Sequence, residues 1–185
     1  TKWALDAKPY YPAPVKGQLS SSEAHWLFTK RLGPGNYAHL GVLEGLSAWC
    51  QLCGLKDIPS ILYCVDIWEP ILSPAMCDDS HMAKFISICK TNHFEDKVQI
   101  CKGTTLEWAS RLKDKTFNFV FVDADHTYEA AKSDWNAWSP LVRKGGEVAF
   151  HDTHYPPVAS VISEIDDNLW DEVEGIFSIR SFRKK

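Results

Sequence analysis

Two short runs of aspartate and histidine carry the strongest chemical signal in the sequence. The first is Asp123-Ala124-Asp125-His126 and the second is His151-Asp152-Thr153-His154. Carboxylates and imidazoles can hold a divalent metal ion or take a proton from a substrate hydroxyl. The structural alternative is that the aspartates cap helices and the histidines hydrogen-bond within their loops. The two alternatives differ in whether the runs meet in the fold.

A pair of glycines four residues apart is the second candidate feature. It lies in Gly41-Val42-Leu43-Glu44-Gly45-Leu46-Ser47. Glycines let the backbone turn tightly and approach a ligand before a helix begins. The spacing is not the G-x-G-x-x-G of dinucleotide sites, so it weakens a dinucleotide interpretation. An ordinary turn between a strand and a helix is the alternative.

Three more polar residues follow apolar runs. Asp66 stands near the end of the run 61–67, and Thr104 and Thr105 follow the run 98–101. A carboxylate at a strand end could accept hydrogen bonds from a ribose diol. The threonines could meet the edge of a base or simply cap the next helix.

The elements that must position these residues alternate along the chain. Short strand-like runs lie at 37–41, 61–67, 98–101, 117–122 and 147–150, and helix-length segments lie between them at about 45–55, 79–93, 104–113 and 127–139. This alternation predicts right-handed crossovers and a parallel sheet covered on both faces. A further helix near 157–168 and two closely spaced strands at 170–174 and 177–182 predict an antiparallel hairpin at the end.

The predicted fold class is therefore α/β, a single doubly wound domain with a mostly parallel seven-stranded sheet. In such sheets ligands bind beyond the carboxyl ends of the strands, near the point where strand order reverses. Adjacent parallel strands lie about 4.8 Å apart. If the strands before the two acidic runs are neighbours, Asp123, His151 and Asp152 could reach one ion or one substrate hydroxyl.

Two segments are expected along the chain. Residues 1–19 contain Pro9, Pro12 and Pro14 and no apolar period, so they predict an extended arm. Residues 20–185 form the domain, and Ser20 with Glu23 has the spacing of a capping box at the start of its first helix.

The composition excludes several classes of protein. The chain has 185 residues, a formal charge of −4 and 45% hydrophobic residues, which suit one globular domain. Mild acidity argues against a nucleic-acid binder, and the apolar runs are too short to cross a membrane. No leader-like segment is visible at the start, so we expect a cytoplasmic protein. The six cysteines are expected to be free thiols, because a domain of this size needs no disulfides.

Taken in order, these motifs resemble those of class I S-adenosylmethionine-dependent methyltransferases, over about residues 20–182. The ordered elements are the glycine turn, Asp66, the run from Asp123 to Tyr128, Gly145-Gly146 and His151-Asp152. The pattern is most similar to small-molecule O-methyltransferases acting on macrolide sugars and to cephalosporin-hydroxylase-like proteins, and more distantly to catechol O-methyltransferases. The resemblance implies a Rossmann-like methyltransferase that binds S-adenosylmethionine and methylates a hydroxyl of a sugar or phenol-like small molecule.

The resemblance also implies roles for individual residues. Gly41, Glu44, Gly45 and Ser47 would surround the methionine part of the cofactor, Asp66 the ribose, and Trp68, Thr104 and Thr105 the adenine. Asp123, His151 and Asp152 would hold Mg²⁺ or Mn²⁺ in a metal-using enzyme, Asp123 acting in catalysis with His126 as the general base. Two residues depart from the pattern: His39 stands where relatives usually carry an acid facing the ammonium group of the cofactor, and His151 stands where an oxygen ligand is common.

Several alternatives stay open at this point. The same fold could be a non-catalytic module that binds a cofactor or nucleotide, or the His and Asp cluster could serve a metal-dependent hydrolase or oxygenase. Residues 69–77 and the arm could form a lid that sets the choice of acceptor. The sequence does not name the acceptor, and a homodimer formed through the arm or the C-terminal hairpin stays open.

Overall fold

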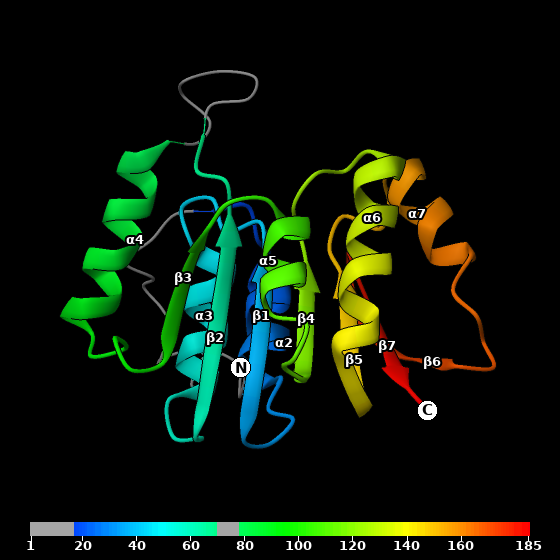
Figure 1. Ribbon diagram of the computed structural model, residues 1–185, viewed down its shortest axis with the longest axis horizontal. Coiled ribbons are helices and arrows are strands. Elements are labelled where there is room, and N and C mark those ends of the chain that lie inside the picture. The colour runs from blue at the N-terminus through cyan, green and yellow to red at the C-terminus, as the bar shows by residue number, and fades with distance from the viewer. Residues whose placement is uncertain (1–16, 70–77) are drawn as a thin grey trace.

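The protein, described here by a computed structural model over residues 17–69 and 78–185, is built on one seven-stranded sheet (Figure 1). The strands are β1 Gly35–Leu40, β2 Ser60–Asp66, β3 Val98–Lys102, β4 Phe117–Val122, β5 Val142–Phe150, β6 Trp170–Ile176 and β7 Ile179–Lys184. Their order is β3-β2-β1-β4-β5-β7-β6, in which β7 pairs antiparallel with both β5 and β6. The predicted doubly wound sheet with a C-terminal antiparallel hairpin is confirmed.

Helices cover both faces of the sheet. They are α2 Ser21–Thr29, α3 Leu46–Leu55, α4 Asp79–Thr91, α5 Thr105–Arg111, α6 Tyr128–Trp138 and α7 Pro156–Ser163, with a short 3₁₀ turn η1 at Ser139–Leu141. One hydrophobic core contains buried side chains of α2, α3 and α4, and a second contains those of α5, α6 and α7. None of the helices described is long and apolar enough to cross a bilayer.

The central strand β4 supplies side chains to both cores. All six of its residues are buried, with Phe119 and Phe121 in the first core and Val120 and Val122 in the second. Burial of each large side chain contributes roughly 1.5–3 kcal/mol, which is why this strand is nearly continuously apolar. The two cores together hold the carboxyl end of β4 at the centre of the sheet.

An irregularity in β4 has a local cause. The pairing of β4 with β5 shifts register between Phe117 and Phe119. There the side-chain amide of Asn118 donates to the carbonyls of Leu32, Gly33 and Pro34 at 2.9–3.2 Å. This bulge ties the loop after α2 to the sheet.

Several local predictions can be compared with the structure. The capping box at Ser20 is present, with the Glu23 amide donating to Ser20 Oγ at 3.3 Å. Cys50, Cys53, Cys64, Cys89 and Cys101 are buried and free. The glycines at 145–146 lie within β5, which begins at Val142, whereas the expected strand covered only 147–150. Most of the predicted arm 1–19 and of the predicted lid 69–77 lies outside the described residues.

Candidate functional site

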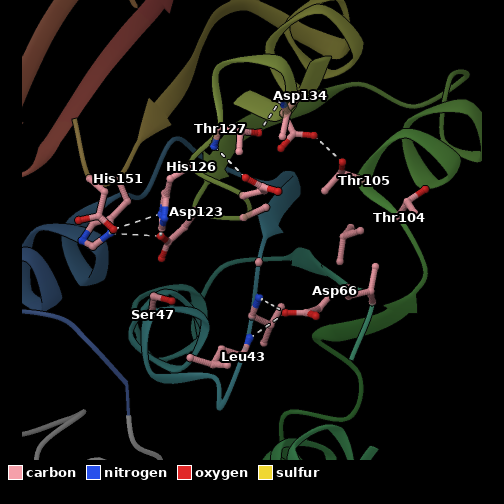
Figure 2. A pocket seen from close by; sticks show the side chains of 18 of the residues that line it. Leu43, Ser47, Asp66, Thr104, Thr105, Asp123, His126, Thr127, Asp134 and His151 are labelled. Carbon is pink, nitrogen blue, oxygen red and sulfur yellow. Dashed lines mark hydrogen bonds and ion pairs between the residues drawn. The ribbon is translucent and has the colours of Figure 1, made fainter. Parts of the chain in front are cut away.

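A cavity of about 940 Å³ lies beyond the carboxyl ends of the central strands (Figure 2). Strand order reverses between β1 and β4, so this is the place where an open α/β sheet offers a ligand crevice. The predicted site residues in its wall are Gly41, Glu44, Ser47, Asp66, Thr104, Thr105, Asp123, His126, His151 and Asp152. Residues 17–19 also line it. The structure thus brings both acidic runs and the glycine turn to one cavity.

Asp66 at the end of β2 fixes the shape of the glycine turn. Its Oδ2 accepts hydrogen bonds from the backbone N–H groups of Val42 at 2.7 Å and Leu43 at 2.8 Å. Its Oδ1 accepts from the N–H of Trp68 at 2.8 Å. Hydrogen bonds to an ionised carboxylate are stronger than neutral ones. The acid predicted to face a ribose therefore also organises the turn on the neighbouring strand.

Two predicted cofactor residues do not line the cavity. Trp68 is 1% exposed, and its indole N–H donates to the carbonyl of Leu43 at 3.2 Å, so it supports the glycine turn from the core. The indole therefore lies outside the cavity wall, where the adenine was predicted. Gly45 has a φ of +99°, and an added Cβ would lie 2.3 Å from the ring of Phe85 on α4. Glycine is required there to start α3 against α4.

Ser47, in the first turn of α3, belongs to a buried chain of polar groups. Its Oγ lies 2.8 Å from Nε2 of His39, whose Nδ1 lies 2.5 Å from Oε1 of Gln51. Burial lowers the pKa of His39, so the imidazole is neutral near neutral pH. His39 therefore faces Ser47 and Gln51 rather than the cavity. Gln51 was not foreseen, because a glutamine in an apolar helix carries no distinctive spacing.

The two threonines after β3 take different positions. Thr104 is the N-cap of α5, where its side chain accepts from the Glu107 amide, so the structural alternative holds although Thr104 also lines the cavity. Thr105 donates its hydroxyl proton to the carboxyl of Asp134 on α6. Burial raises the pKa of Asp134 to about 6. Asp134 is a cavity residue that sequence patterning did not reveal.

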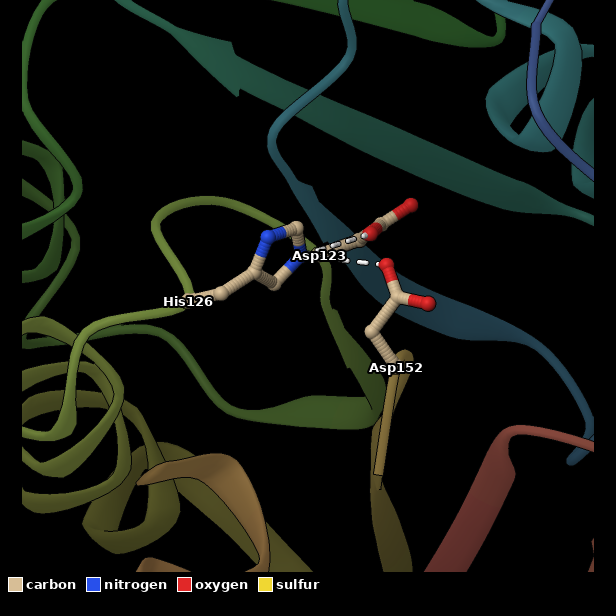
Figure 3. Close-up of side chains that lie close together, drawn as sticks. All are labelled: Asp123, His126 and Asp152. Atoms are coloured by element: carbon tan, nitrogen blue, oxygen red, sulfur yellow. Dashed lines mark ion pairs between the residues drawn. The ribbon is translucent and has the colours of Figure 1, made fainter. Parts of the chain in front are cut away.

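The two acidic runs meet at the ends of β4 and β5 (Figure 3). Donor atoms of Asp123, His126 and Asp152 lie within 4.8 Å of one another. His126 Nε2 is 3.2 Å from Asp152 Oδ2 and 3.8 Å from Asp123 Oδ1. The contact with Asp123 raises the pKa of His126 above its ordinary value, although burial alone would lower it. Two carboxylate oxygens and one imidazole nitrogen fit a divalent ion such as Mn²⁺, while Mg²⁺ prefers oxygen alone.

His151 has a different place from the one predicted for a metal ligand. It is 6% exposed, and its Nδ1 lies 3.1 Å from Asp123 Oδ1 and 3.2 Å from Asp152 Oδ2, while Nε2 lies 3.5 Å from Glu23 Oε1. Burial alone would lower its pKa, but the three carboxylates outweigh burial and raise the pKa to about 9. His151 thus contacts both aspartates but is not in the candidate metal group. The candidate metal group has His126 in its place.

Neighbouring residues set the positions of these side chains. The backbone N–H groups of Asp123 and His151 donate to Leu40 and Val122 at 2.9 and 3.0 Å, which extends the sheet pairing past the strand ends. Asp152 has a φ of +52°, an uncommon conformation for a residue other than glycine, and such strain is often found at functional sites. Asp125 accepts the Thr127 amide at 2.7 Å and so shapes the start of α6.

Comparison with known proteins agrees with this geometry. The sequence profile of a family described as "Methyltransferase domain" matches residues 38–153, which is more than half of the chain. The chain belongs to this methyltransferase-domain family. The matched region of this methyltransferase domain runs from β1 to the loop after β5 and includes both acidic runs.

Individual relatives of this methyltransferase domain are distant. The curated "Uncharacterized protein y4gI" of Sinorhizobium fredii (strain NBRC 101917 / NGR234) is 22% identical over 159 residues; the match covers 80% of this chain and 16% of that protein. The chain thus spans about a sixth of the length of this relative.

Solved structures show the same fold. The O-methyltransferase from Bacillus cereus, solved in complex with SAH, superposes with a TM-score of 0.69 at 16% identity over 98% of this chain and 88% of that chain. CalS11, described as a calicheamicin methyltransferase, superposes with a TM-score of 0.66 at 14% identity over 88% of this chain and 77% of that chain.

Proposed function

We propose that the protein transfers a methyl group from S-adenosylmethionine to a hydroxyl of a small molecule. The observation that carries this proposal is the single cavity joining the glycine turn and Asp66 with Asp123, His126 and Asp152. Membership in the methyltransferase-domain family supports it, and so does likeness in fold to an O-methyltransferase solved with SAH. When bound, the cofactor supplies an electrophilic methyl group on a sulfonium.

The half of the cavity formed by β1 and β2 suits the cofactor. The turn from Gly41 to Glu44 and the hydroxyl of Ser47 would surround its methionine part, and the Asp66 carboxylate would face the ribose hydroxyls. Thr105 and Asp134 lie in the remaining wall, where a hydroxyl and a carboxyl can face a base. Binding at both the methionine end and the base end would orient the methyl donor, and positioning of this kind supplies much of the catalysis of group transfer.

The half formed by β4 and β5 suits the acceptor hydroxyl. Asp123, His126 and Asp152 would hold a divalent ion, which would supply a positive charge that lowers the pKa of the acceptor hydroxyl. His151 lies 3.1 Å from Asp123 Oδ1 and 3.2 Å from Asp152 Oδ2, and would hold both carboxylates in place. In a metal-free site, His126 is the residue placed to take the proton, as the sequence resemblance implies.

The acceptor is proposed to be a small sugar or phenol-like molecule. The cavity is large enough for the cofactor and a compact acceptor, since ligand pockets of about 300–1,000 Å³ bury most of a drug-sized ligand. CalS11 is described as a TDP-rhamnose 3′-O-methyltransferase, which makes a sugar hydroxyl the first class of acceptor to test.

The deciding experiment combines binding with turnover. Calorimetry with S-adenosylhomocysteine should detect binding, and S-adenosylmethionine with panels of sugar and phenol acceptors should give a methylated product. Asp123→Asn should lower turnover at least a hundredfold while binding of S-adenosylhomocysteine stays within a few-fold, and the exposed control Asp114→Asn should change neither. Failure of the wild-type protein to bind S-adenosylhomocysteine would exclude the proposal.

The same assays test the metal and the two rival functions. Chelator should abolish turnover and Mn²⁺ or Mg²⁺ should restore it; full turnover in chelator would leave His126 to act alone. Binding without transfer to any acceptor would favour a non-catalytic module. Metal-dependent turnover of a substrate without the methyl donor would favour a hydrolase or oxygenase.

A further inference from the structure

The buried polar chain behind the glycine turn contains no ionised group. Ser47 is 7% exposed and lines the cavity, whereas His39 and Gln51 are 0% and 2% exposed and lie behind it. The Ser47 Oγ to His39 Nε2 distance is 2.8 Å, and the His39 Nδ1 to Gln51 Oε1 distance is 2.5 Å. Both are hydrogen-bond distances, so the three side chains form one connected unit.

The direction of the hydrogen bonds follows from the chemistry of each atom. In this structure Gln51 Oε1 faces His39 Nδ1; a carbonyl oxygen can only accept, so with this orientation of the amide Nδ1 carries the proton. A neutral imidazole has one donor and one acceptor nitrogen, which makes Nε2 the acceptor. Ser47 therefore donates its only hydroxyl proton to Nε2. The lone pairs that remain on Ser47 Oγ are available to the cavity.

We propose that His39 and Gln51 are positioning residues that hold the Ser47 hydroxyl as a hydrogen-bond acceptor, so that the cavity selects a cationic amino group at this point. The inference rests on the proposed function, in which this group is the ammonium of the methionine part of the cofactor. The neutral chain of Gln51, His39 and Ser47, called the relay below, would then take the place of a carboxylate at position 39. An acceptor oxygen with no proton to donate favours an ammonium group over a neutral or anionic one.

Glu44 supplies a negative charge on the same side of the cavity. It lies in the turn that precedes Ser47 and lines the cavity. Its Oε1 is 3.6 Å from Nε2 of His81, and its Oε2 has no hydrogen-bond partner within the described part of the chain. A buried carboxylate oxygen without a donor is costly unless a ligand supplies one. A cationic group within reach of Oε2 would supply that donor.

The direct test of the relay is made on the wild-type protein, and one variant serves only to assign the signals. ¹⁵N-histidine NMR of the wild-type protein, with the His39 signals assigned by their loss in His39→Gln, reports which ring nitrogen carries the proton. The expected result is a neutral ring with the proton on Nδ1 throughout the pH range 6–8. A proton on Nε2 would mean that the Gln51 amide is turned and that His39 donates to Ser47. The Ser47 hydroxyl would then donate its own proton to the cavity, which would overturn the inference whether or not cofactor binds.

The functional test compares two ligands by calorimetry. They are S-adenosylhomocysteine and its analogue without the α-amino group. The wild-type protein should bind the amino-bearing ligand at least about tenfold more tightly, because a hydrogen bond to a charged group contributes 1.5–3 kcal/mol. Ser47→Ala and Gln51→Met should each reduce this ratio about tenfold. Ser60→Ala, whose hydroxyl bonds only to the Ile58 carbonyl among the described contacts, is the matched control.

The outcomes separate the relay from the wider proposal. A merely structural role would weaken both ligands equally and leave the ratio unchanged in every folded variant. Strong binding of S-adenosylhomocysteine with no preference for its amino group would overturn the relay and leave the proposed function standing. Absence of binding by the wild-type protein would overturn both.

Discussion

Gly41 lies directly against the backbone of Asp123. An added Cβ on Gly41 would fall 2.0 Å from the carbonyl oxygen of Asp123, and the residue has a φ of +84°. The glycine turn and the residues that follow β4 are therefore packed together without an intervening side chain. This contact joins the two halves of the cavity, and no other residue type fits at position 41.

Gly41→Ala should consequently disrupt the site more than an average mutation. The added methyl group must displace backbone on β1 or β4, and alanine also disfavours the positive φ. We expect a loss of unfolding free energy of about 2–4 kcal/mol in denaturant titration and loss of S-adenosylhomocysteine binding. Gly33→Ala is a suitable control, since Gly33 also has a positive φ but has no atom within 4 Å of an added Cβ. Equal effects of the two substitutions would contradict the packing argument.

Asp66→Asn should affect both stability and cofactor binding. One carboxylate oxygen becomes an NH2 group that cannot accept, so either the N–H groups of Val42 and Leu43 or the N–H of Trp68 loses its acceptor. Loss of a buried acceptor costs about 1–3 kcal/mol. Denaturant titration should show this loss, and calorimetry should show at least tenfold weaker S-adenosylhomocysteine binding. A stable variant with unchanged affinity would remove Asp66 from both roles.

Trp68→Phe should separate the core position of Trp68 from a place in the cofactor site. The phenylalanine cannot donate to the Leu43 carbonyl, so the unfolding free energy should fall by about 1 kcal/mol. Affinity for S-adenosylhomocysteine should stay within about threefold of wild type, because Trp68 is buried outside the cavity wall. A large loss of affinity with unchanged stability would place the indole against the adenine after all.

Asp134 should make the stability of the protein dependent on pH. Its pKa in the folded state is raised to about 6, above the ordinary value of 3.8, so the folded protein binds more protons than the unfolded chain between these values. The protonated carboxyl thus favours folding below about pH 4, and this contribution is lost as the pH rises through 6. The penalty at pH 8 is on the order of 2–3 kcal/mol.

Asp134→Asn should therefore raise the unfolding free energy more at pH 8 than at pH 4.5, where the folded carboxyl is protonated. The Thr105 hydroxyl can still donate to the amide oxygen of the asparagine. Denaturant titrations of wild type and variant across pH 4.5–8 measure the difference. A difference that is constant with pH would show that Asp134 does not titrate in this range.

Local patterns in the sequence were sufficient to predict the fold. The capping residue Ser20, the continuous apolar strand 117–122 and the alternation of strands and helices each have a short-range cause, and the structure contains all three. Parallel strand order then placed Asp123 and Asp152 together, because both follow the carboxyl ends of neighbouring strands.

Long-range contacts explain what the sequence did not reveal. Trp68 and Thr104 stand at plausible ligand positions, but one is turned into the core and the other caps a helix. His151 follows a strand like a metal ligand, yet it packs against Glu23 from a helix more than 100 residues away along the chain. Such contacts depend on tertiary packing and have no periodic signature.

The carboxylate of Glu23 links both ends of the chain to the acidic cluster. Its Oε1 accepts from the backbone N–H of Ser178 at 3.1 Å and from its hydroxyl at 2.5 Å, and the same oxygen lies 3.5 Å from His151. A substitution at one of these three positions alone is unfavourable, because it would leave the carboxylate of Glu23, the ring of His151 or the donors of Ser178 without a partner. Positions 23, 151 and 178 should therefore covary among homologous sequences.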